Sequence, residues 1–319
     1  MTKINRRLTI LGIGAGLVSA CGDLEIAESN KPEPRGGLGG TGIVGTVTDF
    51  SSLMLNGLRV VTPEDLVVTS ALGSLTVGDL AIGHNLTVEA TTEANVLTAR
   101  RVHLAHPVIG RVRNLAQDGR SARIAGVRVE LDPGAIGQLE LSKTVAVSGA
   151  WRNDHVVASR VDQIAAETPD VIAGEVKGIN KDRLAIGGQT LLIGENQRPL
   201  VGGYSTVTGR LTEEGFLVES LVEGRFTGAA GPLKSLSVEG YLEASENAPF
   251  YALSGLGHSF DREARLAALE DDRAVFSGDY IGTFKVQSAL RLPTNFADRR
   301  ALLRQVNREP QSTPLATTR

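Results

Sequence analysis

A short glycine-centred pattern recurs four times in this sequence of 319 residues. The copies are IVGTV (43–47), VIGRV (108–112), IAGEV (172–176) and, more loosely, SVEGY (237–241). Their central glycines are 65, 64 and 66 positions apart. A fixed period of this length indicates that one supersecondary unit is repeated along the chain. The sequence is therefore predicted to fold as four similar small units rather than as one large domain.

Each unit carries further landmarks in the same order. A hairpin signal follows the first stretch, at LMLNGLRVV (53–61), ARIAGVRVEL (122–131), LAIGGQTLLI (184–193) and YALSGLGHSF (251–260). A strand that ends near a small residue comes next, and another apolar strand completes the unit. We expect five short strands in so short a span to close into a barrel, because closure removes exposed sheet edges.

We therefore expect an all-β protein made of tandem, five-stranded, OB-like β-barrels. The predicted repeats are 42–106, 107–168, 169–226 and a degenerate copy at 234–292, which we expect to line up as a rod. Short helices are predicted at 261–272 in the last repeat and at 294–310, within a C-terminal helix and tail over 293–319.

Several of these landmarks resemble a known family. The G-x-V opening, the Asn56-Gly57 hairpin, the LTVGDL turn (75–80) and the closing L-x-A-x-x-V strand are similar to bacterial domain-of-unknown-function family 5666. The resemblance is clearest over 42–104. It implies exported, tandem, OB-like barrels, and it brings no established activity or functional residue.

The N-terminus has the layout of a secretory signal. Lys3, Arg6 and Arg7 precede an apolar run at 8–18, and the only cysteine of the chain, Cys21, follows the small residues Ser19 and Ala20. The stretch VSAC (18–21) resembles a bacterial lipobox, in which the cysteine carries lipid. We expect a signal peptide at 1–20 and an exported protein anchored by lipid on Cys21, in the outer membrane facing the periplasm or at the cell surface. The alternative is an ordinary cleaved signal with an incidental cysteine.

Proline and glycine mark the predicted spacers of the chain. Residues 21–41 are expected to form a flexible tether, since Pro32 and Pro34 precede a glycine cluster. Linkers open to proteases are expected near 104–108, 165–171 and 224–235.

No motif in the sequence identifies a reaction. His106 lies three positions after His103, which on a strand puts the two on opposite faces, and His84 is expected in a solvated turn. The formal charge is −3, with 33 basic and 36 acidic residues, so nucleic acid is a disfavoured partner. We predict neither a cofactor nor a metal site.

One set of residues is a candidate ligand rim. Trp151 and Tyr280 each lie two residues after a glycine that ends a strand, and the set of candidates is Trp151, Arg152, Arg210 and Tyr280. The alternative is that the aromatic side chains seal a barrel mouth or form contacts between barrels.

The favoured hypothesis is a non-catalytic binding, adaptor or structural protein of the cell envelope. Its partners would be the membrane, through the lipid anchor, and an envelope protein or glycan. The alternatives are an envelope enzyme with its site at a junction between barrels, and a polysaccharide or nucleic-acid binder that uses barrel grooves.

Overall fold

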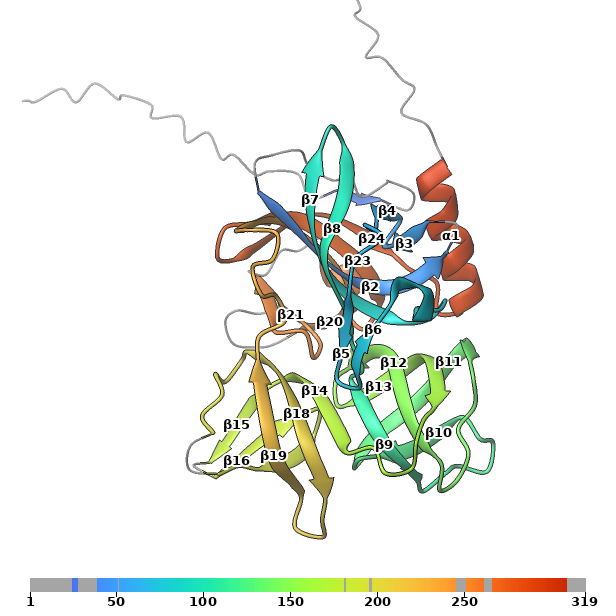
Figure 1. Cartoon of the computed structure of the whole chain (residues 1–319), viewed down its shortest axis with the longest axis vertical. Coiled ribbons are helices and arrows are strands. Elements are labelled where there is room, and N and C mark those ends of the chain that lie inside the picture. The colour runs from blue at the N-terminus through green and yellow to red at the C-terminus, as the bar shows by residue number, and fades with distance from the viewer. Residues whose placement is uncertain are drawn as a thin grey trace, which may run out of the picture.

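The fold is described here from a computed structural model of the chain (Figure 1). It describes residues 25–27, 39–50, 52–180, 182–194, 197–244, 251–260 and 266–308. The expected signal peptide and Cys21 lie outside these residues. Within the segment expected to be a tether, strand β1 (Glu25–Ala27) pairs in parallel with β24 (Phe284–Arg291), and the first barrel strand already begins at Gly40.

Repeat 1 is a closed barrel of five strands. β2 pairs with β3 and β7, β3 with β4, β4 with β8 in parallel, and β7 with β8, so that every strand has a neighbour on each side. The predicted OB-like barrel is thus confirmed. Between the third and fourth strands the chain inserts a hairpin, β5 (Val68–Ser70) and β6 (Gly73–Leu75), and a 3-10 turn, η1 (Val77–Asp79). The barrel strands are β2 (Gly40–Asp49), β3 (Leu53–Leu55), β4 (Leu58–Val61), β7 (Asn85–Glu93) and β8 (Val96–Leu104).

Repeat 2 closes in the same order. β9 pairs with β10 and β12, β10 with β11, β11 with β13 in parallel, and β12 with β13. The strands are β9 (Val108–Arg113), β10 (Ser121–Ile124), β11 (Val127–Ile136), β12 (Thr144–Arg152) and β13 (His155–Gln163).

Repeat 3 has the same pairings, but its first strand is split at Val176. The first half, β14, pairs with β18, and the second half, β15, pairs with β16; β17 pairs with β19 in parallel. The strands are β14 (Asp170–Glu175), β15 (Lys177–Asn180), β16 (Arg183–Ile186), β17 (Gln189–Leu192), β18 (Tyr204–Leu211) and β19 (Phe216–Glu223).

Repeat 4 is an incomplete version of the same ring. β20 pairs with β21 and β23, β21 with β22, and β23 with β24, while no ladder among the described residues joins β22 to β24. The helix expected at 261–272 is, in its described part, a single 3-10 turn, η2 (Leu266–Leu269). The remaining strands are β20 (Leu233–Ala244), β21 (Tyr251–Leu253), β22 (His258–Phe260) and β23 (Arg273–Tyr280).

The recurring small residue in the fourth strand of each repeat marks a bulge. The register slips at Ser148/Gly149, Thr208/Gly209 and Ser277/Gly278, and at Ala90 in repeat 1. A β-carbon on Gly149 would overlap the carbonyl oxygen of Val157 on the neighbouring strand. Bulges bend strands and increase their twist, so these positions allow each short sheet to curve into a barrel.

The four repeats do not form a rod, because the chain turns back on itself. The first half of β2 pairs in parallel with β20, so repeats 1 and 4 share one sheet, and β9 pairs with β14, so repeats 2 and 3 share another. Figure 1 shows repeats 1 and 4 above, in blue to cyan and orange to red, and repeats 2 and 3 below, in green and yellow. In every pair the contact is made by the first strand of each repeat.

The predicted C-terminal helix is present as α1 (Phe296–Arg308), and it packs on repeat 4. Leu303 and Val306 are buried against Val275, Leu290 and Leu292. No helix in the described part of the chain has the length and apolar character needed to cross a membrane.

The expected linkers are less open than the sequence suggests. Residues 104–108 are buried throughout, because they lie between repeats 1 and 2. Residues 224–231 are attached to repeat 1 through Glu89, as described below. Only the segment near 165–167 is exposed along its length.

Candidate ligand-binding site

The structure places Trp151 inside the molecule and not on a rim. Its side chain is 2 % exposed, and Nε1 donates a hydrogen bond to the carbonyl oxygen of Ala173 in repeat 3 at 2.8 Å. The ring lies so close to Gly187 of repeat 3 and Gly255 of repeat 4 that a β-carbon at either glycine would overlap it. Trp151 therefore joins repeats 2, 3 and 4, as the inter-barrel alternative anticipated, and the rim expectation is wrong for this residue.

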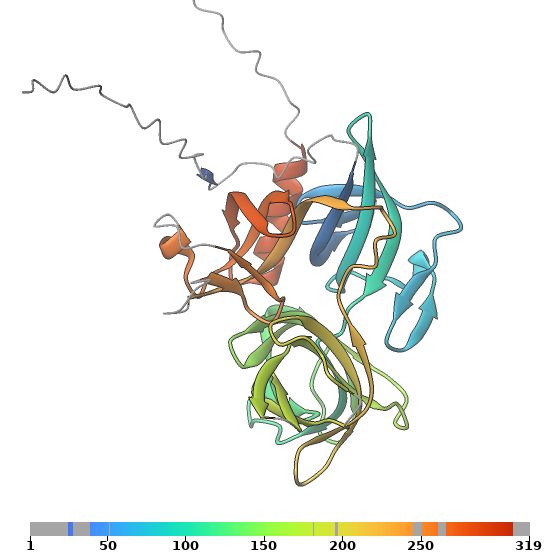
Figure 2. The same cartoon turned by 90° about the vertical axis from the view of Figure 1, so that its left-hand side faces the viewer.

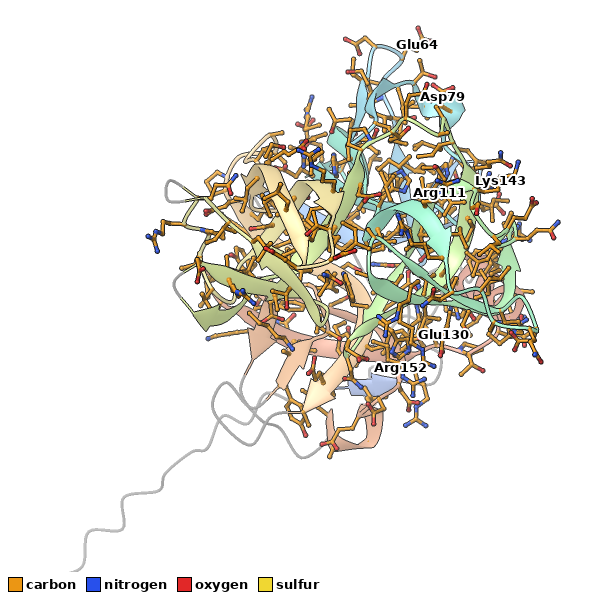
Figure 3. The ribbon with its side chains drawn as sticks, turned by 90° about the horizontal axis from the view of Figure 1, so that it is seen from below. Glu64, Asp79, Arg111, Glu130, Lys143 and Arg152 are labelled. Carbon is orange, nitrogen blue, oxygen red and sulfur yellow. The ribbon has the colours of Figure 1, made fainter. Side chains whose placement is uncertain are left out.

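The other three rim candidates do not converge. The exposed guanidinium of Arg152 lies 5.5 Å from the ring centre of Tyr241, on the surface of repeat 2 (Figure 3). Arg210 is exposed on repeat 3 and pairs with Glu219 at 3.4 Å. Tyr280 is half-buried against the core of repeat 4. These residues do not form a common site.

His84 also differs from the expectation of a solvated turn. It is buried where repeat 1 meets repeat 2, and its Nε2 lies 3.1 Å from a carboxylate oxygen of Asp162. Burial alone would raise the pKa of Asp162, but His84 and Arg160 outweigh that effect and lower it to about 2. This contact is part of an interface between repeats.

A cavity of about 180 Å³ lies between repeats 1 and 3, and we call it the junction cavity. Repeat 1 supplies β7, β8 and the tip of the β5–β6 hairpin; repeat 3 supplies β18, the end of β19 and the residues that follow it. In Figure 2 the chain leaving β19 rises beside the cyan strands β7 and β8. The lining residues include Ala71, Thr87, Arg101, His103, Tyr204 and Arg225.

Arg225 is the unusual residue of this cavity. Its side chain is only 9 % exposed, and its guanidinium carbon lies 3.8 Å from the ring centre of Tyr204. Among the described residues, Nε and Nη1 have no hydrogen-bond partner. Burial lowers the pKa of Arg225, but an arginine in a protein keeps its charge. Burying a cation whose N–H donors lack acceptors costs free energy unless another group accepts hydrogen bonds from it.

The segment that carries Arg225 is held by Glu89 of β7. One oxygen of this buried carboxylate accepts hydrogen bonds from the backbone N–H and the hydroxyl of Thr227, at 2.7 and 2.8 Å, and the other accepts from the backbone N–H of Ala229 at 2.7 Å. Arg101 donates to Glu89 at 3.3 Å and to the carbonyl of Arg225 at 3.1 Å. Burial alone would raise the pKa of Glu89, but these donors together lower it.

Two further polar groups from repeat 1 face the cavity. Thr87 is 1 % exposed, and its hydroxyl has no partner among the described residues. His103 lies with its Nδ1 2.9 Å from the hydroxyl of Thr69. Burial, with smaller contributions from Arg101 and Arg225, lowers the pKa of His103 to about 4, so its ring is neutral near pH 7. The cavity is thus lined by cations, hydroxyls and a neutral imidazole.

The remaining surface offers weaker candidates. A groove of about 440 Å³ on repeat 1, between 62–67 and 75–78, carries the exposed side chain of Glu64, and Figure 3 places Glu64 and Asp79 at the outer edge of the molecule. The described residues contain no group of three or more His, Cys, Asp or Glu side chains arranged to hold a metal ion. The hairpin strands that line a groove in OB-type barrels, β3, β4, β10, β11, β16 and β17, carry no aromatic residue on which a base could stack.

Sequence reasoning missed Arg225, Thr87 and Glu89. Arg225 lies in what the repeat pattern defines as a linker, and Thr87 resembles any other strand residue. Glu89 did leave a signal, since it is a charge in the middle of the apolar strand LTVEA (86–90). Such a charge needs a buried partner, although the sequence does not say which.

Comparison with known proteins adds no further constraint on the site. A scan against protein-family models found no matching model, and a search of curated proteins found no match.

Proposed function

We propose that this chain is a lipid-anchored protein of the bacterial cell envelope that binds a small polar ligand in the junction cavity without catalysing a reaction. The observation that carries the proposal is the buried guanidinium of Arg225, whose Nε and Nη1 have no partner among the described residues. Binding sites in proteins are concave and hold a few convergent polar groups, and the cavity between repeats 1 and 3 has this character.

The envelope part of the proposal rests on the N-terminal sequence. The positive residues Lys3, Arg6 and Arg7, the apolar run and Cys21 support export and lipid attachment. Two or more acyl chains on Cys21 would give stable anchoring. The resemblance to the exported family 5666 points the same way and stays a prediction.

Binding, rather than catalysis, is supported by the chemistry of the lining. His103 is the side chain best suited to proton transfer there, and its pKa of about 4 makes it a weak base at neutral pH. A hydroxyl, that of Thr69, lies 2.9 Å from His103, but the described lining residues include no carboxylate that could orient the imidazole as the third member of a catalytic triad. An envelope protein or glycan that carries the ligand group is the expected partner class.

The binding proposal is tested with full-length protein extracted from membranes in mild detergent. Native mass spectrometry should detect a small bound molecule, and Ala71→Trp, which places a large ring at the cavity mouth, should abolish it. Ser74→Trp is the matched control, because Ser74 lies on the same hairpin, is exposed and does not line the cavity. Equal occupancy in both variants, or turnover of the bound molecule, would contradict the proposal.

The anchoring proposal has its own test. Cys21→Ala should release the protein from membranes in detergent partitioning, and a variant that stays in the detergent phase would contradict lipid attachment.

A further inference from the structure

We infer that the ligand of the junction cavity is a compact oxyanion, that is, a carboxylate or phosphate group, held by Arg225 and Thr87. The inference rests on the proposed function and adds the chemical class of the ligand. It follows from the charges around the cavity, from the groups that lack partners there and from the size of the space.

The charges around the junction cavity favour an anion. Arg101 and Arg225 are cationic, and the lining residues include no acidic side chain among those described. Glu89 lies nearby, but it already accepts four hydrogen bonds, from Thr227 twice, Ala229 and Arg101. Oε1 accepts three of these bonds and Oε2 accepts one, and none of the four comes from Arg225. The guanidinium of Arg225 therefore has no ion-pair partner among the described residues, and its Nε and Nη1 have no acceptor there.

Two groups at the cavity lack hydrogen-bond partners among the described residues. The ring of Tyr204 stabilises the guanidinium through a cation–π contact but accepts none of its in-plane N–H groups. A guanidinium is planar and matches the oxygens of carboxylate and phosphate groups better than it matches neutral acceptors. The unpartnered hydroxyl of Thr87 supplies a further donor on the opposite wall, from repeat 1. The oxygens of a bound oxyanion would accept hydrogen bonds from the guanidinium of Arg225 and from the hydroxyl of Thr87.

The junction cavity is small. Pockets for drug-sized ligands have volumes of roughly 300–1,000 Å³. The junction cavity, at about 180 Å³, takes only a compact group or the end of a larger molecule. The half-buried hydroxyls of Thr206 and Thr208, from repeat 3, also face it. A ligand held by both walls would link repeats 1 and 3, and it would therefore stabilise the folded protein.

The experiment titrates the full-length protein in detergent with sodium phosphate, sodium acetate, glycerol and choline chloride at constant ionic strength. Calorimetry measures affinity. We expect phosphate or acetate to bind and glycerol and choline not to bind. Thr87→Val removes the hydroxyl at constant shape and should weaken anion binding about tenfold, the loss of roughly one hydrogen bond. Arg225→Lys keeps the charge, loses the planar donors and should weaken binding at least as much.

Arg210→Lys is the control, because Arg210 is an exposed arginine of the same repeat that pairs with Glu219. It should leave the affinity within about twofold of the wild type, as expected for an exposed pair. Anion binding that is equal in Thr87→Val, Arg225→Lys and the wild type would overturn the inference. Saturable binding of glycerol or choline that Ala71→Trp abolishes would overturn the anion class and leave the proposed function standing. Absence of binding by all four probes, or binding that Ala71→Trp does not change, would overturn the inference, while the proposed function is decided separately by the native mass spectrometry of Ala71→Trp and Ser74→Trp.

Discussion

Arg299 in the C-terminal helix donates a hydrogen bond to Asp132 of repeat 2, which lies 167 residues earlier in the chain. Arg273 of repeat 4 donates to the same carboxylate oxygen at 3.5 Å and to Glu239 at 2.7 Å. Thr46 of repeat 1 completes the group, since its backbone N–H donates to Glu239 at 2.7 Å. The four charged side chains are each 1–3 % exposed, so this network buries charges from three parts of the chain at one point.

The first prediction is that Asp132→Asn destabilises the whole protein. Removing one charge from a buried cluster leaves its partners uncompensated, and such losses cost about 3–5 kcal/mol of the free energy of unfolding. Urea unfolding of the full chain measures the change. Glu219→Gln removes a carboxylate from an exposed pair and should cost about 0.5 kcal/mol or less. Equal effects of the two substitutions would show that Asp132 is solvated.

The second prediction uses Trp151, the only tryptophan of the chain. Because its indole is buried among three repeats, native fluorescence should be blue-shifted and resistant to iodide quenching, and unfolding in urea should make it red-shifted and quenchable. Trp151→Ala should cost about 3–5 kcal/mol, as expected for a large buried ring. Strong quenching of the native protein would place Trp151 on a surface rim instead.

The third prediction concerns the segment after repeat 3. Glu89→Gln removes the negative charge that binds Thr227 and Ala229, so this segment should detach and trypsin should cleave after Arg225. Wild-type protein should resist tryptic cleavage there, while a protease of broad specificity should cut it near 165–167, which is exposed and contains no Lys or Arg. Glu93→Gln, an exposed change on the same strand, is the control. Rapid cleavage after Arg225 in the wild type would contradict the attachment.

The fourth prediction is a loss of stability in mild acid caused by His106. Burial, with a smaller contribution from His84, lowers the pKa of His106 from 6.5 to about 4, while its Nδ1 lies 3.3 Å from the carbonyl of Val147. Below pH 6.5 the His106 side chain is protonated in the unfolded chain, whereas in the folded protein it stays neutral until the pH approaches 4. The stabilisation is therefore complete above pH 6.5 and is lost as the pH falls towards 4, and it amounts to roughly 3 kcal/mol.

Thermal unfolding between pH 7 and 4 tests this prediction. The wild type should lose stability over that window, and His106→Asn, which keeps a donor near the Val147 carbonyl, should show a shallower slope. Parallel slopes for the wild type and His106→Asn would contradict the prediction.

The local structure of each repeat could be predicted from the sequence, because turn chemistry is local. Asn56-Gly57 turns the first hairpin with positive φ at both residues, as that signal requires. Pro293 followed by an apolar periodicity predicted α1. The assembly could not be predicted in this way. The first half of β2 pairs with β20, and the residues of a strand do not by themselves specify which strand lies beside it.

The candidate site could not be predicted from the sequence for the same reason. Arg225 and Thr87 are unremarkable within their own repeats, and they become a site only because the chain turns back and brings repeat 3 beside repeat 1. Trp151 shows the opposite error, since an isolated aromatic residue after a strand predicted a surface role for a side chain that the assembly buries.

The chain turns back so that repeat 4 pairs with repeat 1. The junction cavity, the charge network and the Glu89 attachment all depend on this arrangement. Thr41 of β2 and Ser235 of β20 are register partners with hydroxyl oxygens 2.9 Å apart. In Thr41→Cys/Ser235→Cys protein, mild oxidation should form a disulfide within one chain, since paired strands bring α-carbons within the required range. Peptide mapping that instead finds both thiols free in the folded protein would contradict the account.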